Sequence, residues 1–173
     1  MANAARPAMN VTDAIRTKRA VREFADRKLA NEDIRAILDA GRRAQSSKNT
    51  QPWHFIAVTG RESLKSLSEC GKFAGHLAGA ALGVALVKKK DGWDFDLGQA
   101  AAYMQLAAWE LGIGSCIASM WEPDKAGAIL GLPADLVCDT MISFGHPAQK
   151  ADPKPKSGGR RAFEDVVRFE RWT

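Results

Sequence analysis

The sequence predicts a single domain that mixes helices with short strands. Two observations predict it: apolar residues recur three or four apart in some segments, and other segments are short, continuous apolar runs. The chain has 173 residues, of which 46% are hydrophobic, and this suits one compact core. No internal repeat or second core is visible. We assign residues 1–9 to a tail and residues 10–173 to the domain, with residues 148–173 as an extended arm.

The first half of the chain predicts helices around two strands. Residues 11–16 form a short helix-like stretch, and Asn31 is expected to cap a second helix. Residues 55–58 predict a strand, and Leu64 and Leu67 mark a short amphipathic helix. A buried strand is expected at residues 81–87. The apolar residues of the second helix follow the helical period: Ile34, Ile37, Leu38, Gly41 and Ala44.

The second half begins with a long helix at residues 97–111. Its apolar stripe is wide enough for the helix to be buried on more than one side. Residues 115–118 and 137–144 predict two strands. A short helix between them starts at Pro123 and stops at Gly131. The proline-rich, basic tail after Pro147 predicts an arm, because it has no apolar pattern of its own.

Composition and charge argue against several classes of protein. The net charge of +5 would permit nucleic-acid binding, but aromatic residues do not alternate with basic ones, and no nucleic-acid motif appears. No apolar run is long enough to cross a membrane. The widely spaced cysteines predict core thiols in a reducing cytoplasm, with no metal site: Cys70, Cys116 and Cys138. We therefore expect no nucleic-acid, membrane or metal partner.

Residues 46–55, Ser-Ser-Lys-Asn-Thr-Gln-Pro-Trp-His-Phe, are the most informative segment. Ser47, Asn49 and Gln51 offer donors and acceptors that suit the polar edge of a flat heterocycle. Pro52 pushes Gln51 out of the helical region, so the polar cluster is expected in a fixed loop. Taken alone, the segment fits an ordinary helix-ending loop equally well.

Two basic segments are candidates for binding an anion. The first contains Lys18, Arg19 and Arg22, whose donors can converge on a phosphate. The second is the tail from Lys154 to Arg161. Spacing alone leaves open whether the two meet, and a solvated basic turn is the alternative for each.

Together these segments resemble the nitroreductase family, whose members are FMN-dependent NAD(P)H oxidoreductases that bind FMN at a dimer interface. The matching motifs occur in the family's order over about residues 10–167: basic-x-basic-aromatic at 18–24, the Ser-Ser-to-Trp signature at 46–55, acidic-x-Gly-x-Ala at 96–100, Leu-Gly-x-Gly-Ser at 111–115, and Gly-x-Pro at 145–147. The Ser-Ser-to-Trp signature is the most specific of them.

The resemblance implies an α+β fold, with a mixed central sheet flanked by helices, in an intertwined homodimer. It also implies that the C-terminal segment reaches across the partner subunit. By resemblance, the cations of residues 18–22 lie along FMN, Asn49 and Gln51 hold it from the partner side, and a tail cation binds its phosphate. The implied cofactor-binding residues are Lys18, Arg19, Ala20, Arg22, Ser47, Asn49, Gln51, Arg160 and Arg161.

The implied reaction takes hydride from NADH or NADPH and then reduces a small aromatic or unsaturated acceptor by a ping-pong mechanism. Nitroaromatics and quinones are such acceptors. No catalytic side chain is expected, because the chemistry belongs to the flavin. Trp93 and Trp121 are candidates to edge a flat substrate. A non-catalytic flavin-binding or sensing protein is the alternative.

Some positions depart from the family's pattern. Ala20 stands where a serine is usual, and Gly158 where a second phosphate-binding lysine is frequent. Residues 119–121, Ser-Met-Trp, replace a Glu-Gly pair near the reactive edge of the flavin. Residues 88–95 are too few for a lid helix, so an open substrate site is expected. His54, His76 and His146 are expected to be structural.

Overall fold

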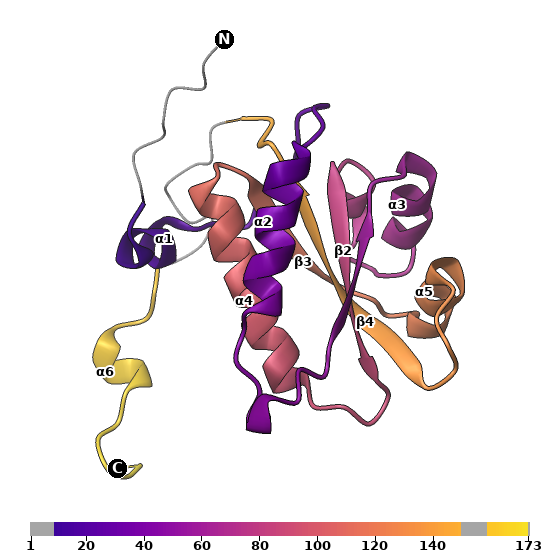
Figure 1. Ribbon diagram of the computed structural model, residues 1–173. Coiled ribbons are helices and arrows are strands. Elements are labelled where there is room, and N and C mark those ends of the chain that lie inside the picture. The colour runs from indigo at the N-terminus through magenta and orange to yellow at the C-terminus, as the bar shows by residue number, and fades with distance from the viewer. Residues whose placement is uncertain (1–8, 150–158, 173) are drawn as a thin grey trace.

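The computed structural model describes residues 9–149 and 159–172, which form a sheet with helices on both faces (Figure 1). Four strands pair in the order β1-β2-β4-β3, and every pairing among them is antiparallel. Their bounds are β1 His54–Val58, β2 Leu82–Lys89, β3 Gly114–Ser119 and β4 Leu136–Gly145. The predicted α+β fold is confirmed. Among the described residues, the parallel part of the expected mixed sheet is one isolated bridge, between Ala20 and Ser115.

The two faces of the sheet carry separate cores, because side chains alternate along each strand. Leu82, Val84 and Leu86 of β2 face α2 (Asn31–Arg42) and α4 (Asp94–Glu110). Ala85 and Val87 face the opposite core, where α3 (Arg61–Ser68) and α5 (Pro123–Leu130) lie. Figure 1 shows α2 and α4 side by side on one face, and α3 and α5 on the other.

The close packing of α2 on α4 fixes one face of the molecule. A Cβ placed on Gly41 of α2 would lie 2.1 Å from Cε of Met104, so the two helices meet at a glycine. The predicted stripe of α4 is confirmed as core at Leu97, Ala101 and Met104, which are buried. α4 is therefore a fixed frame for the loops at its two ends.

The helix boundaries confirm most of the predicted signals and correct one. Pro123 is the first residue of α5, and Gly131 ends that helix with a left-handed φ of 66°. The prediction that Asn31 caps α2 is wrong. Ala30 occupies the cap position with an extended backbone, and no side chain caps the helix. Asn31 is thus already the first helical residue, so it cannot act as the cap.

The remaining elements are short. They are α1 (Val11–Thr17), α6 (Phe163–Val166), and two 3-10 turns, Ser47–Asn49 and Gly75–Leu77. The link from β2 to α4 holds only residues 90–93, which confirms that no lid helix stands there. The three cysteines are free and buried, as predicted. Within the described residues, no helix has the length and apolar character needed to span a bilayer.

Candidate functional site

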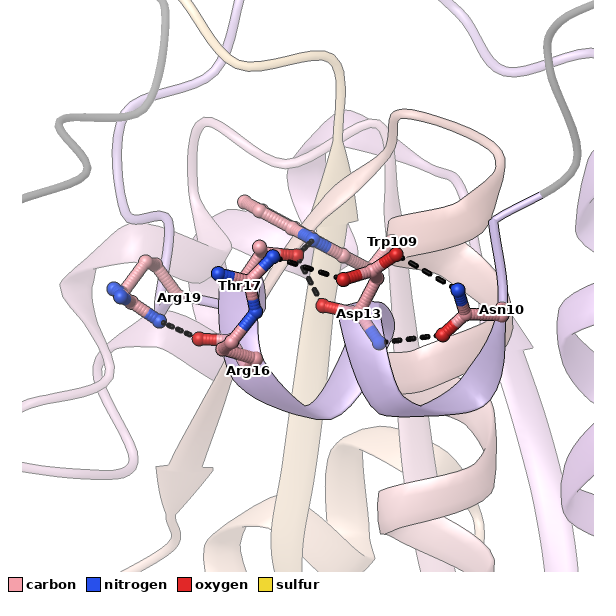
Figure 2. Close-up of polar contacts among 6 residues, drawn as sticks. All are labelled: Asn10, Asp13, Arg16, Thr17, Arg19 and Trp109. Atoms are coloured by element: carbon pink, nitrogen blue, oxygen red, sulfur yellow. Dashed lines mark hydrogen bonds and ion pairs between the residues drawn. The ribbon is translucent and has the colours of Figure 1, made fainter.

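The first basic segment is secured at the end of α1. Asn10 caps this helix by accepting a hydrogen bond from the amide of Asp13 at 2.9 Å. Thr17 Oγ1 accepts a hydrogen bond from Trp109 Nε1 at 3.0 Å, which ties α1 to the end of α4 (Figure 2). The chain then meets β3, where the amide of Val21 donates to the Ser115 carbonyl at 2.9 Å. Lys18 and Arg22 thus leave a fixed stretch of backbone.

The charges of Lys18 and Arg22 converge near Cys116 of β3. Burial lowers the pKa of the half-buried Lys18, and the nearby Cys116 opposes that shift. Burial raises the pKa of the Cys116 thiol, while Arg22 and Lys18 both act to lower it. We call Lys18 and Arg22 the basic cluster. Ala20 is exposed between them.

Arg19 differs from its two neighbours. Its Nη1 donates to the carbonyl of Arg16 at 2.9 Å, as Figure 2 shows, and to that of Lys18 at 3.0 Å. These carbonyls lie at the C-terminal end of α1, where a cation is favourable. In this arrangement, the guanidinium of Arg19 stabilises the turn from which the basic cluster leaves.

His76 lies close to Arg22 of the basic cluster. His76 Nδ1 lies 2.7 Å from Ser143 Oγ, and that hydroxyl donates to the Cys116 carbonyl at 3.3 Å. Burial lowers the pKa of His76, and Arg22 lowers it further; the nearby Ile117 carbonyl opposes the shift. The buried Nε2 of His76 has no hydrogen-bond partner among the described residues. His76 is therefore held as a neutral ring beside β3.

The second predicted segment forms a tight loop, residues 46–51, which we call the 46–51 loop. Ser46 Oγ accepts a hydrogen bond from the amide of Gln51 at 2.9 Å, which closes the loop. Gln51 has a φ of 48°, so the prediction that it leaves the right-handed helical region is confirmed. Ser47, Asn49 and Gln51 are all exposed at the surface.

The basic cluster and the 46–51 loop lie at opposite ends of α4. The amide of Ser47 donates to Asp96 Oδ2 at 3.3 Å, near the start of the helix, whereas Trp109 holds Thr17 near its end. Residues 96 and 109 are about 20 Å apart along a helix that rises 1.5 Å per residue. Figure 1 shows the two regions at the two ends of α4. One protomer therefore does not bring the two predicted segments together.

An open groove of about 610 Å³ runs between α4 and the neighbouring strands β3 and β4. Leu97, Ala101, Ile117 and Met120 give it an apolar lining. Ile117 is 48% exposed although it is a large apolar residue. The same strand, β3, carries Cys116 near the basic cluster, and the side chains of Cys116 and Ile117 point to opposite faces of the strand.

The two predicted substrate tryptophans flank this groove in sequence. Trp93 precedes Asp94, which lines it, and Trp121 follows Met120, which also lines it. Both indoles are exposed, Trp93 by 66% and Trp121 by 60%. Trp93 stacks on Phe95 at 5.3 Å between ring centroids, and Trp121 meets the edge of Phe73 at 6.0 Å. Both indoles are therefore accessible flat surfaces, but neither is among the residues that line the groove.

The tail cations are less constrained. Arg160 and Arg161 are exposed, and Arg161 Nη2 donates to the Asp165 carbonyl at 2.6 Å. No hydrogen bond or ion pair between described residues joins either arginine to the basic cluster. Lys154, Lys156 and Gly158 lie outside the described residues.

The described part of the arm, residues 159–172, presents apolar side chains to solvent. The exposed ones are Phe163, Val166, Phe169 and Trp172. The hydrogen bonds of this segment stay within it, as between Arg168 and the Glu164 carbonyl. A second groove, of about 780 Å³, lies between α2 and β1, with Ile34, Leu38 and Trp53 in its lining.

Sequence reasoning missed Asp96 and His76 as parts of this region. The acidic-x-Gly-x-Ala motif did contain Asp96, but nothing in it indicated a contact with residue 47. His76 carried no signal, because its partner Ser143 is 67 residues away in sequence. Among the described residues, no group of three His, Cys, Asp or Glu side chains is placed to hold a metal ion.

Comparison with known proteins identifies the family. The model of the Nitroreductase family matches residues 15–91 and 75–146. A protein of Archaeoglobus fulgidus, provisionally named NADH dehydrogenase/NAD(P)H nitroreductase, is 34% identical over 149 aligned residues, and the alignment covers 80% of this chain and 86% of the relative.

Solved structures agree with that match. An FMN-dependent nitroreductase from Clostridium difficile superposes with a TM-score of 0.82 at 27% identity, covering 92% of this chain and 98% of the other. A Parabacteroides distasonis protein, provisionally named NADH dehydrogenase/NAD(P)H nitroreductase, gives 0.83 at 26% identity, covering 93% and 98%. The chain therefore belongs to the nitroreductase family.

Proposed function

We propose that two copies of this chain form an FMN-dependent oxidoreductase that oxidises NADH or NADPH and reduces a small aromatic or unsaturated acceptor. One observation carries the proposal: β3 has the basic cluster near its Cys116, and Ile117 and Ser119 of the same strand line the open apolar groove. Residues 115 and 119 of this strand are about 13 Å apart at 3.3 Å per residue. Neighbouring side chains of a strand point to opposite faces, so the cations near Cys116 and the groove at Ile117 lie on the two sides of this one strand.

The residues present fit the parts of FMN. The ammonium of Lys18 and the guanidinium of Arg22 suit a phosphate or an anionic ring edge. The groove between α4 and β3 offers an apolar surface for a flat ring. The exposed carboxamides of Asn49 and Gln51 suit the polar ring edge and the sugar-like chain.

A second copy of the chain is part of the proposal. The 46–51 loop and the basic cluster of one protomer lie about 20 Å apart along α4, so a site using both draws them from two protomers. The exposed apolar residues of the arm, among them Phe169 and Trp172, support such an association, because they are not buried within their own subunit. The Arg160 and Arg161 side chains would then reach the partner's site.

When bound, FMN would supply the hydride and electron transfer between the two substrates. The side chains of this protein bind and orient it. Lys18 and Arg22 are fixed before the reaction and stabilise negative charge by preorganised electrostatics. Among the described residues no lid helix covers the groove, so the nicotinamide and the acceptor can use it in turn, which is a ping-pong order. Trp93 and Trp121 provide stacking surfaces for both.

The test is the visible absorption spectrum of the purified protein, before and after NADH or NADPH is added without oxygen. A flavin spectrum that bleaches with either nucleotide supports a flavin reductase, and turnover with nitroaromatics and quinones then defines the acceptor. Bound flavin that does not bleach favours the sensing alternative. A protein that takes up no FMN, even on incubation with it, contradicts the proposal.

A further inference from the structure

We propose that Asp96 is a positioning residue that holds the 46–51 loop in the shape in which Asn49 and Gln51 meet the flavin. The inference rests on the proposed function, which assigns those two carboxamides to FMN. Asp96 itself is only 4% exposed and belongs to the first turn of α4. Its role is therefore structural support for the loop, with no contact to the flavin.

The 46–51 loop has a strained backbone. Three of the four non-glycine residues with positive φ in the described chain lie in it: Lys48 at 51°, Asn49 at 55° and Gln51 at 48°. In this left-handed region the Cβ atom of an ordinary residue crowds its own backbone, which costs free energy at Lys48 and Gln51, whereas asparagine tolerates the conformation better. A loop built this way without glycine keeps its shape only if other contacts stabilise it.

Contacts within the loop stabilise only part of that shape. The amide of Gln51 donates to Ser46 Oγ, and the Thr50 hydroxyl donates to the Ser47 carbonyl at 3.0 Å. Within the described chain, one hydrogen bond joins residues 46–51 to another element, the bond from the amide of Ser47 to Asp96 Oδ2 at 3.3 Å. Asp96 therefore connects the strained loop to the rigid frame of α4.

The surroundings of Asp96 fit this role. No ion pair with a described cation is within 4.0 Å of its carboxylate, and the N-terminal end of α4 offsets its negative charge. Its Oδ1 is 3.5 Å from Gln99 Nε2, and Gln45 Nε2 donates to Gln99 Oε1 at 2.7 Å. Gln45 and Ser47, the neighbours of Ser46 on its two sides, are thus both held near the start of α4.

The shape of the 46–51 loop matters because it sets the direction of the two side chains that are proposed to bind FMN. Asn49 and Gln51 are exposed, and a change of their backbone from left-handed to right-handed would turn their carboxamides elsewhere. Binding residues must stay within a fraction of an ångström of their working geometry to be effective. Loss of the Asp96 bond is therefore expected to weaken FMN binding while the fold remains.

The test compares Asp96→Asn with the wild-type protein. Asparagine keeps the size of the side chain but removes its charge, so the bond from Ser47 weakens. Two quantities are measured: amide hydrogen exchange of residues 47–51 without flavin, and the dissociation constant for FMN by flavin fluorescence. We expect faster exchange confined to the loop and about tenfold weaker FMN binding, the effect of one charge-assisted hydrogen bond. Glu110→Gln, an exposed substitution on the same helix, is the matched control and should change neither.

A second variant tests the strain directly. Lys48→Gly places glycine at a φ of 51°, which glycine adopts without crowding. Added to Asp96→Asn, it should recover roughly threefold in FMN affinity, because the loop then needs less support. Absence of any recovery would contradict the strain mechanism.

Two other results would overturn the proposal: unchanged loop exchange in Asp96→Asn, or exchange that accelerates equally throughout the sheet. If the wild-type protein binds no FMN, the proposed function fails. The exchange measurement, made without flavin, still decides the effect of Asp96 on the loop.

Discussion

Trp109 Nε1 donates a hydrogen bond to Thr17 Oγ1, and this bond joins two residues 92 positions apart in the chain. The same hydroxyl donates to the Asp13 carbonyl at 2.6 Å, so Thr17 is a relay between α1 and α4. Lys18 follows immediately and is half-buried. The position of the basic cluster therefore depends on a hydroxyl that the family motif does not include.

Replacing this hydroxyl should loosen the basic cluster. We expect Thr17→Ala to lower the free energy of unfolding by about 1 kcal/mol, because both hydrogen bonds of the hydroxyl are lost while the backbone remains. FMN binding should weaken several-fold. Thr17→Ser, which keeps the hydroxyl, is the control for both measurements, made by urea unfolding and flavin fluorescence. Equal behaviour of the two variants would show that the relay does not matter.

Arg22 should control the titration of His76. Its positive charge disfavours a second positive charge on the imidazole, and it acts in the same direction as burial. Arg22→Ala should therefore raise the pKa of His76, as followed by NMR of the ring protons. Arg16→Ala is a suitable control, because Arg16 is paired with Asp13 on the exposed side of α1. A His76 pKa that does not change in Arg22→Ala would place the guanidinium elsewhere in solution.

The same histidine should make stability fall in mild acid. The pKa of His76 is below 6.5 in the folded protein, so below pH 6.5 the unfolded chain binds a proton that the folded chain does not. The stability contributed by the neutral ring is present above pH 6.5 and is lost as the pH falls toward the folded pKa. Between pH 7 and pH 5, the free energy of unfolding should decrease less in His76→Asn than in the wild type. Parallel curves for the two proteins would exclude this role.

The regular elements were predictable because their signals are local. The stripe of α4 and the Pro123 and Gly131 boundaries of α5 depend on residues within a few positions of one another. The misplaced cap at Asn31 has a local cause too. Asn is a frequent cap residue, but here the extended backbone belongs to Ala30, and α2 is stabilised by packing against α4.

The arrangement of the site was less predictable, because it depends on contacts between distant residues. The motifs identified Lys18, Arg22, Asn49 and Gln51 as residue types. They did not indicate that the two pairs lie at opposite ends of α4. The left-handed backbone at Lys48 was equally hidden, since lysine has no preference for that conformation.

Replacing Ala20 by serine should strengthen FMN binding. The methyl group is exposed beside the basic cluster, and its residue forms the parallel bridge with Ser115. Ala20→Ser should restore the hydroxyl that the resemblance implies, and we expect FMN to bind up to about tenfold more tightly through one added hydrogen bond. Ala20→Val, which adds bulk without a donor, is the control. Tightening in both variants, or in neither, would contradict a role for the hydroxyl.

The arm provides the test of the dimer. Phe169 is 79% exposed and Trp172 is 86% exposed, so charges placed there should leave the folded protomer intact. If these side chains are buried against a second copy, Phe169→Asp with Trp172→Asp should shift the protein from dimer to monomer in sedimentation velocity, because the charges would lose water at the interface.

FMN binding should be lost together with the dimer, since the basic cluster and the 46–51 loop of one protomer cannot reach each other across about 20 Å of α4. Arg171→Gln in the same segment is the control and should remain dimeric. A double variant that becomes monomeric but still binds FMN with unchanged affinity would show that one protomer suffices. In that case, Asn49 and Gln51 would have to be removed from the proposed site.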